Sequence, residues 1–226
     1  MSSPLRHAIR HDEALARLRA GNIRFTQNVR SIEALTSQYR RDALVAGQAP
    51  FATVLSCSDS RVPSELVFDC GLGDLFVVRV AGNVVAPSIV GSIEFAAATF
   101  GTELVVVMGH TRCGAVAATI DVLKGGNSAP SENVYDIVDR IRPSIAEIVR
   151  GIGNDESVLR AATRANIRAS ADHLRHSSRI IAGRIAEGRL VVVGAEYALE
   201  TGQVDFFDVP ESTLWRASSI EGRRLQ

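Results

Sequence analysis

The sequence is poor in the features that mark several large classes of protein. Lysine and arginine together number 25, as do aspartate and glutamate, so the net charge is zero and favours neither nucleic acid nor an anionic membrane as a partner. No apolar run is long enough to span a bilayer, and residues 1–10 lack the apolar core of a signal peptide. The 3 cysteines fit a reducing compartment better than a disulfide scaffold, so a cytoplasmic location is expected.

The chain also has no internal repeat and no low-complexity linker. With 226 residues, 46% of them hydrophobic, it is long enough to bury one sizeable core. We therefore predict a single domain over residues 1–226, with an N-terminal helical arm over about 1–47.

Short apolar runs alternate with helical patterns along the chain. The runs 51–56, 75–80, 103–109 and 189–193 are typical of buried parallel strands, and 203–207 follows a turn that would place it beside the fourth strand. Helical patterns cover 12–25, 31–46, 64–68, 87–100, 114–124, 132–149 and 155–187, with an interruption expected near 177–178 and a break or kink at Pro143. The predicted fold is α/β: a mostly parallel central sheet of four strands plus an antiparallel edge strand, flanked by helices.

Three soft metal ligands follow two of these strands. Cys57 comes directly after the first strand, and His110 and Cys113 come after the third. Because ligands in open α/β sheets bind beyond the carboxyl ends of the strands, we expect these residues to meet in space. Two thiolates and one imidazole suit Zn²⁺, and three protein ligands leave one position for water or substrate, as in catalytic zinc sites.

Each ligand alone has an ordinary explanation. A cysteine at the end of a strand is most often a small buried hydrophobe, and an isolated His-x-x-Cys is weak evidence for a metal. All three candidates follow predicted strands, and Asp59 and Arg61 stand beside the first. This combination favours a metal site.

The motifs around these ligands resemble those of the β-class carbonic anhydrases. They are CSDSRVP at 57–63, FVVRVAGN at 76–83, SIEF at 92–95 and GHTRCGA at 109–115, and the similarity extends from 14–25 to 193–197. The resemblance implies reversible hydration of carbon dioxide to bicarbonate and a proton by attack of zinc-bound hydroxide. It also implies a homodimer or a dimer of dimers.

The resemblance assigns roles to residues next to the metal. Asp59 would accept a hydrogen bond from the zinc-bound hydroxide, and Arg61 would fix the Asp59 carboxylate. The alternative is that Asp59 itself closes the site as a fourth ligand. Because two thiolates cancel the charge of the ion, we expect the hydration rate to rise towards alkaline pH.

The resemblance also places the chain in one of two subtypes. The regulated subtype has a tryptophan where this chain has Val54, so its bicarbonate pocket is expected to be absent although Arg79 fills the arginine position. Gln48 matches a glutamine that the other subtype contributes across the dimer interface to bind substrate oxygen. The remaining substrate contacts implied are an apolar wall of Phe76, Ala81 and Phe95 and the backbone N–H of Gly114.

Two features leave alternatives open. The apolar stripe of the N-terminal helices either packs on the chain's own sheet or, as the resemblance implies, wraps a second subunit. Cys70 departs from the family's usual glutamine and is either a buried thiol or a redox-sensitive or additional metal-binding residue.

Three rival functions use the same residues. The first is hydrolysis of carbonyl sulfide or carbon disulfide at the same metal site. The second is a thiol enzyme with Cys57 as nucleophile and His110 as base, which Cys113 makes less attractive. The third is a non-catalytic zinc site, which would require neither Asp59 nor Arg61.

Overall fold

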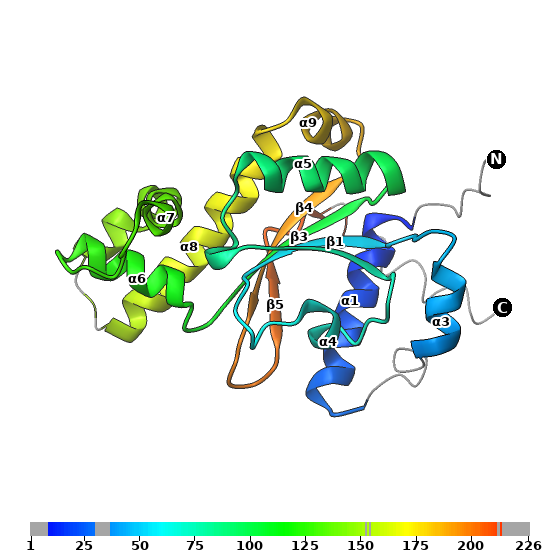
Figure 1. The fold of residues 1–226 in the computed structure, drawn as a ribbon, viewed down its shortest axis with the longest axis horizontal. Helices are drawn as coiled ribbons and strands as arrows, with labels where there is room; N and C mark the ends of the chain where they lie inside the picture. The colour runs from blue at the N-terminus through cyan, green and yellow to red at the C-terminus, as the bar shows by residue number, and fades with distance from the viewer. Residues whose placement is uncertain (1–8, 30–36, 152, 154, 212, 214–226) are drawn as a thin grey trace.

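The computed structural model describes residues 9–29, 37–151, 153, 155–211 and 213. Its centre is a five-stranded sheet in the order β2-β1-β3-β4-β5. The strands are β1 (Ala52–Ser56), β2 (Leu75–Arg79), β3 (Leu104–His110), β4 (Val191–Tyr197) and β5 (Val204–Phe207). The pairs β1–β2, β1–β3 and β3–β4 are parallel and β4–β5 is antiparallel, which confirms the predicted fold class (Figure 1).

Helices cover the sheet on both faces and extend beyond one end of it (Figure 1). They are α1 (His11–Thr26), α3 (Ser37–Leu44), α4 (Ser64–Val67), η1 (Ala81–Asn83), α5 (Pro87–Phe95), η2 (Ala96–Phe100), α6 (Gly114–Leu123), α7 (Glu132–Arg150), α8 (Asp155–His176) and α9 (Arg179–Ala186). None of the helices formed by the described residues combines the length and the apolar composition needed to cross a membrane.

The side chains of β3 show how the two faces are filled. Leu104, Val106 and Met108 pack with α1 and α4, whereas Val105 and Val107 pack with α5, α8 and α9. Successive side chains of a strand point to opposite faces, so a strand covered on both faces needs apolar residues at every position. All seven residues of β3 are accordingly buried.

The N-terminal helix α1 is fastened to its own chain. Its apolar residues Ala14, Leu15 and Leu18 are buried against the sheet. The buried Asn22 amide donates to the carbonyl oxygens of Val67 and Gly202 at 3.1 and 2.9 Å. For α1, these contacts favour packing on its own sheet over wrapping a partner.

The second helix of the arm is described only in part. Residues 31–36 of the predicted second helix lie outside the described residues, and α3 begins at Ser37. The Tyr39 side chain of α3 is exposed, and Arg40 reaches back to the carbonyl oxygen of Leu72 at 2.8 Å.

A third cluster of apolar side chains lies beyond the carboxyl ends of β1 and β3. It contains Cys57 and Cys113 together with residues of α6, α7 and the beginning of α8, such as Val116 and Ile141. The candidate metal ligands are therefore part of a packed layer and not of a mobile surface loop.

Two local expectations need correction. Pro143 does not break its helix, because α7 runs without interruption from Glu132 to Arg150. Burial of Val138, Ile141 and Ile145 on the same helix offsets the loss of one backbone hydrogen bond. The fourth strand also continues past its predicted end at 193, through Gly194 to Tyr197.

Candidate metal centre

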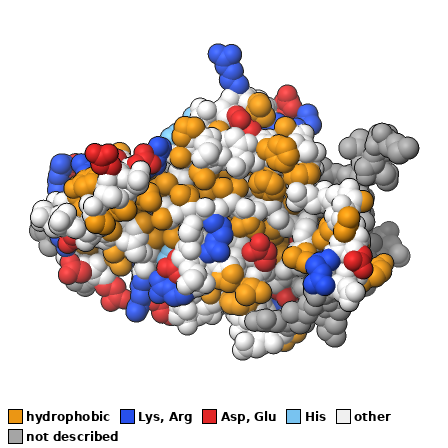
Figure 2. Space-filling model, in the orientation of Figure 1, with side chains coloured by type: hydrophobic (Ala, Val, Ile, Leu, Met, Phe, Trp, Pro, Cys, Tyr) orange, Lys and Arg blue, Asp and Glu red, His pale blue; other side chains and the backbone are white. Residues whose placement is uncertain are grey.

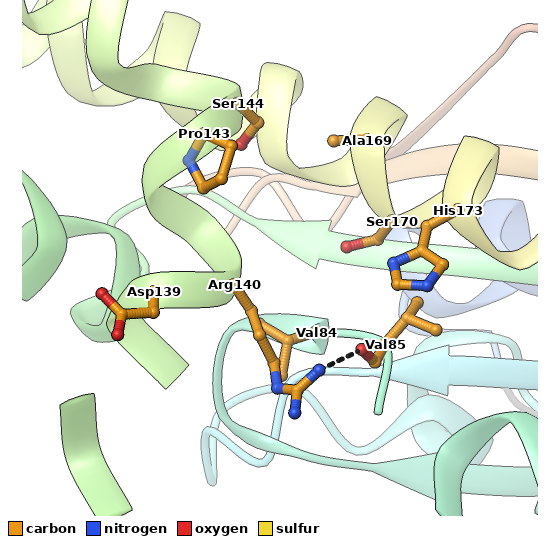
Figure 3. Close-up of a pocket in the computed structure, with 9 residues that line it drawn as sticks. All are labelled: Val84, Val85, Asp139, Arg140, Pro143, Ser144, Ala169, Ser170 and His173. Carbon is orange, nitrogen blue, oxygen red and sulfur yellow. Dashed lines mark hydrogen bonds between the residues drawn. The ribbon is translucent and has the colours of Figure 1, made fainter. Parts of the chain in front are cut away.

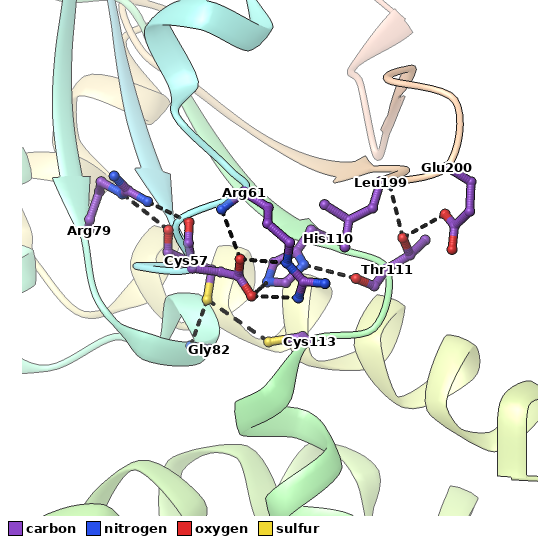
Figure 4. A network of polar contacts seen from close by, with 10 residues as sticks. Cys57, Arg61, Arg79, Gly82, His110, Thr111, Cys113, Leu199 and Glu200 are labelled. Carbon is purple, nitrogen blue, oxygen red and sulfur yellow. Dashed lines mark hydrogen bonds and ion pairs between the residues drawn. The ribbon is translucent and has the colours of Figure 1, made fainter.

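The three predicted ligands meet at the carboxyl edge of the sheet. Cys57 follows β1, His110 ends β3, and Cys113 immediately precedes α6. Since β1 and β3 are parallel neighbours, with Ser56 opposite Met108, their ends lie side by side. All three residues are buried, their ligand atoms lie within 4.8 Å of one another, and the two sulfur atoms are 4.0 Å apart (Figure 4).

The His110 ring is prepared to accept a cation. Its Nδ1 lies 2.9 Å from the carbonyl oxygen of Thr111, so the ring donates its N–H there. The other nitrogen, Nε2, then carries a lone pair, and it is buried without a hydrogen-bond partner in the described part of the chain. A buried lone pair beside two thiol sulfurs fits a metal ion, and this donor set suits Zn²⁺.

The contact between the two sulfur atoms shifts the pKa values of the two cysteines in opposite directions. The hydrogen bond from the Cys113 thiol, with further donors that include the Gly82 N–H at 3.4 Å, lowers the pKa of Cys57. The same hydrogen bond and burial raise the pKa of Cys113. A bound dication would favour loss of the proton that the two sulfur atoms share.

Asp59 and Arg61 form a fixed pair beside the ligands. Arg61 donates from Nε to Asp59 Oδ1 at 2.9 Å and from Nη2 to Oδ2 at 2.7 Å, and its backbone N–H donates to Oδ1 at 3.0 Å. These bonds hold the pKa of Asp59 well below its usual range. Asp59 Oδ2 lies 3.8 Å from His110 Nε2, but the carboxylate is not in the group of mutually close ligand atoms among the described residues.

Arg79 holds the backbone of residues 57–61, which we call the metal loop. From the end of β2 its Nε donates to the carbonyl oxygen of Cys57 at 3.2 Å, and its Nη2 donates to that of Asp59 at 2.7 Å (Figure 4). The sequence marked Arg79 only as part of a bicarbonate pocket that is expected to be absent. The structure shows that its guanidinium binds the backbone of the metal loop.

The predicted substrate contacts fall into two groups. Ala81 begins η1, whose Gly82 donates to Cys57, and Gly114 follows Cys113 at the start of α6. These two lie next to the three candidate ligands, Cys57, His110 and Cys113, which we call the metal group. Gln48 precedes β1, so the whole length of that strand lies between Gln48 and the carboxyl edge of the sheet, where the three ligands meet. Phe76 pairs with Thr53, four residues or about 13 Å before Cys57.

Phe95 joins Phe76 in an aromatic cluster away from the chain's own metal group. Phe95 is 54% exposed, and its ring centroid lies 6.3 Å from that of Phe76. Phe100, which sequence reasoning did not single out, lies 5.6 Å from Phe95 and 5.9 Å from Phe76. No pattern in the sequence marked Phe100, because its part in the cluster depends on the turn of η2 after α5.

Cys70 stands apart from the ligands. Its thiol donates to the carbonyl oxygen of Phe68 at 3.4 Å, and burial raises its pKa to about 12. It does not belong to the metal-ligand group found among the described residues. These observations favour the buried-thiol alternative.

A separate cavity of about 460 Å³ lies between α7, α8 and the segment after η1 (Figure 3). Three of its lining residues have ionisable side chains: Asp139, Arg140 and His173. The Arg140 guanidinium is bonded to the carbonyl oxygen of Val85 at 3.0 Å and to the Asp136 carboxylate. None of the predicted site residues lines this cavity.

Comparison with known proteins agrees with the geometry. Residues 52–204 match the family model described as carbonic anhydrase. The chain belongs to the carbonic anhydrase family. The general reaction of that family is the hydration of carbon dioxide.

Curated relatives and solved structures place the chain within this family. It is 38% identical to carbonic anhydrase 2 of Mycobacterium tuberculosis over 188 residues, which cover 82% of this chain and 87% of that one. It is 38% identical to a carbonic anhydrase of Mycolicibacterium smegmatis over 190 residues, 83% and 89% of the two chains. The β-carbonic anhydrase CafA of Aspergillus fumigatus aligns with a TM-score of 0.67 and 25% identity, covering 83% of this chain and 91% of that chain.

Proposed function

We propose that the protein catalyses the zinc-dependent, reversible hydration of carbon dioxide to bicarbonate and a proton. The observation that carries this proposal is the buried Cys57–His110–Cys113 group, with its free imidazole nitrogen, beside the Asp59–Arg61 pair. A site that served only to staple the fold would need no oriented carboxylate at its edge.

Cys57, His110 and Cys113 would hold the ion. A zinc ion held by these three residues would supply a Lewis acid that activates water. Asp59 stays ionised because Arg61 depresses its pKa, so it only accepts hydrogen bonds. An acceptor fixed in this way orients the O–H of the attacking water and leaves an oxygen lone pair for carbon.

Ala81 and Gly114 would bind the substrate. Ala81 provides an apolar wall for a small neutral molecule. The backbone N–H of Gly114 lies in the first turn of α6, where helical N–H groups have no intrahelical acceptor. We assign it to an oxygen of carbon dioxide or bicarbonate, which the positive end of the helix dipole favours.

Gln48, Phe76 and Phe95 would serve the site of a second copy. Each lies away from the metal group of its own chain. In addition, the large apolar side chains of Phe95, Leu66 and Leu72 are exposed. Figure 2 shows hydrophobic side chains spread over the face that carries α5. We therefore propose a homodimer or a dimer of dimers. Two β-carbonic anhydrases of Sordaria macrospora are described as tetrameric, and one of them aligns with a TM-score of 0.68 at 24% identity.

The free thiols bear on the cellular compartment of the protein. Cys57, Cys70 and Cys113 are all free of disulfide bonds, and two of them would have to remain reduced to bind zinc. We therefore propose a cytoplasmic location.

We also propose that the whole chain forms one domain.

Stopped-flow hydration of carbon dioxide tests the function. Zinc-loaded protein should hydrate carbon dioxide at about pH 8.5, faster than at neutral pH. Cys57→Ala should lose both bound zinc and turnover, whereas the matched variant Cys70→Ala should keep both. Bound zinc without hydration would contradict the proposal and make carbonyl sulfide the next substrate to assay.

A further inference from the structure

The two residues between His110 and Cys113 form a short loop with an unusual backbone. Arg112 has a φ of 57°, in the left-handed region that residues with a side chain rarely adopt. Such a conformation persists only when neighbouring contacts hold it in place. The contacts that hold this loop come from the end of β4 and from the turn between β4 and β5.

Thr111 is bonded to the end of β4 through its backbone N–H and to that turn through its hydroxyl. Its backbone N–H donates to the carbonyl oxygen of Tyr197 at 3.0 Å. Its hydroxyl donates to Glu200 Oε2 at 2.9 Å and accepts from the Leu199 N–H at 3.0 Å (Figure 4). Arg112 Nε meets the other Glu200 oxygen, Oε1, at 2.9 Å.

The third polar group of Thr111 is bonded to the candidate ligand His110. Its carbonyl oxygen accepts the Nδ1 proton of His110, which fixes the tautomer and leaves Nε2 free to bind a cation. A continuous set of hydrogen bonds thus runs from Glu200 through Thr111 to the ligand His110.

We propose that Thr111 and Glu200 are positioning residues that orient His110, and with it the loop to Cys113, for metal binding. The inference rests on the proposed zinc site and adds the residues that control its geometry. The Thr111 hydroxyl is partly buried and has two partners, whereas Arg112 and Glu200 are 68% and 47% exposed. Exposed ion pairs contribute little, so the hydroxyl should matter more than the ion pair.

Zinc release measures the effect without reference to catalysis. Zinc-loaded variants are mixed with an excess of a chromophoric chelator, and the rate of zinc transfer is recorded. Partners that orient a metal ligand typically change metal affinity by about 10–100-fold, so Thr111→Val should release zinc faster by about that factor. Thr111→Ser keeps the hydroxyl and should stay close to the unchanged protein.

Glu200 variants and a matched control separate positioning from general stability. Glu200→Ala should speed release less than Thr111→Val, and Glu200→Gln, which keeps an acceptor, less again. The double variant Thr111→Val with Glu200→Ala should equal Thr111→Val alone, since both act through one hydroxyl. Glu187→Ala removes a similarly exposed partner of Arg189 elsewhere and should change nothing.

Cobalt substitution provides the spectroscopic readout. The visible bands of the cobalt protein depend on ligand geometry, so they should move in Thr111→Val and not in Thr111→Ser or Glu187→Ala. Unchanged release and unchanged bands in a folded Thr111→Val protein would overturn the inference. If Thr111→Val does not fold, release from Glu200→Ala at the rate of Glu187→Ala would overturn it. Failure of the unaltered protein to bind zinc would instead overturn the proposed function.

Discussion

At the residue scale, the metal loop uses two guanidinium groups for different purposes. Arg61 makes a two-bond fork with a carboxylate, whereas Arg79 binds two backbone carbonyl oxygens. Lysine is a single point charge and cannot form the fork. Arg61→Lys should therefore keep its zinc but lose about 10–100-fold in kcat/KM, because Asp59 is no longer held in one orientation.

The control for this variant is Arg17→Lys, which alters an exposed pair with Glu13 of the same 2.7 Å length. It should leave both zinc content and kcat/KM unchanged. Zinc content is measured by elemental analysis and kcat/KM by stopped flow. Full activity in Arg61→Lys would mean that a positive charge near Asp59 suffices.

The three thiols should differ in reactivity when zinc is bound. Cys57 and Cys113 are blocked by the metal, and Cys70 has a pKa raised to about 12, so only about one molecule in ten thousand carries its thiolate at pH 8. Alkylation of Cys70 by iodoacetamide should be slow and should rise about tenfold per pH unit between pH 8 and 11. Removing zinc with a chelator should add Cys57 to the labelled sites.

Peptide mapping by mass spectrometry identifies the labelled residues, with Cys70→Ser as the blank. Rapid labelling of Cys70 at pH 7 would contradict its burial and revive a redox-sensitive role for this residue.

The meeting of Cys57, His110 and Cys113 could be predicted from the sequence, whereas the hydrogen bonds around His110 could not. Cys57 and His110 each stand at the end of an apolar run, and neighbouring parallel strands end at the same edge of a sheet. Thr111 and Glu200 are 89 positions apart, and neither is unusual in its local sequence. Their contact depends on how the β4–β5 turn lies over the loop.

At the scale of elements, Gly21 shows how closely α1 packs on its own chain. A Cβ atom at Gly21 would lie 1.8 Å from the backbone carbonyl oxygen of Phe68, just after α4. Alanine normally stabilises a helix by up to about 1 kcal/mol relative to glycine. At this position the collision should prevail, and Gly21→Ala should lower the free energy of unfolding by about 1–3 kcal/mol.

Gly183 on α9 is the matched control, because a Cβ atom there would meet nothing within 4 Å. Gly183→Ala should raise the free energy of unfolding by about 0.5–1 kcal/mol. Urea denaturation of both variants compares the two signs directly. Stabilisation by Gly21→Ala would mean that α1 does not lie against Phe68.

The end of the fourth strand depends on packing that the local sequence does not show. The predicted strand at 189–193 ends before Gly194, whereas β4 continues to Tyr197. In the structure Gly194 faces Phe207, where a side chain would collide with the ring, and Glu196 pairs with Arg164 at 2.9 Å. Neither partner is evident from the local pattern that predicts a strand.

At the scale of the whole molecule, the residues of the proposed site lie at both ends of the sheet, and one chain does not bring them together. Cys57, Ala81 and Gly114 lie at the carboxyl edge of the sheet, whereas Gln48 lies before the other end of β1. The resemblance named these residues, but no sequence pattern shows which copy each one serves. A two-fold dimer places the same surfaces opposite each other and forms two equivalent sites.

Complementation between two inactive chains decides whether Gln48 acts in the partner's site. Cys57→Ala removes the metal and Gln48→Ala removes the proposed substrate contact, so each homodimer should be nearly inactive. Refolding the two together in equal amounts should yield about half heterodimers, each with one complete site, and so about a quarter of the unaltered activity. Refolding Gln48→Ala with the double variant Cys57→Ala/Gln48→Ala, which differs only in Gln48 of the metal-free chain, should restore nothing. Equal activity in the two mixtures would mean that Gln48 does not cross between subunits.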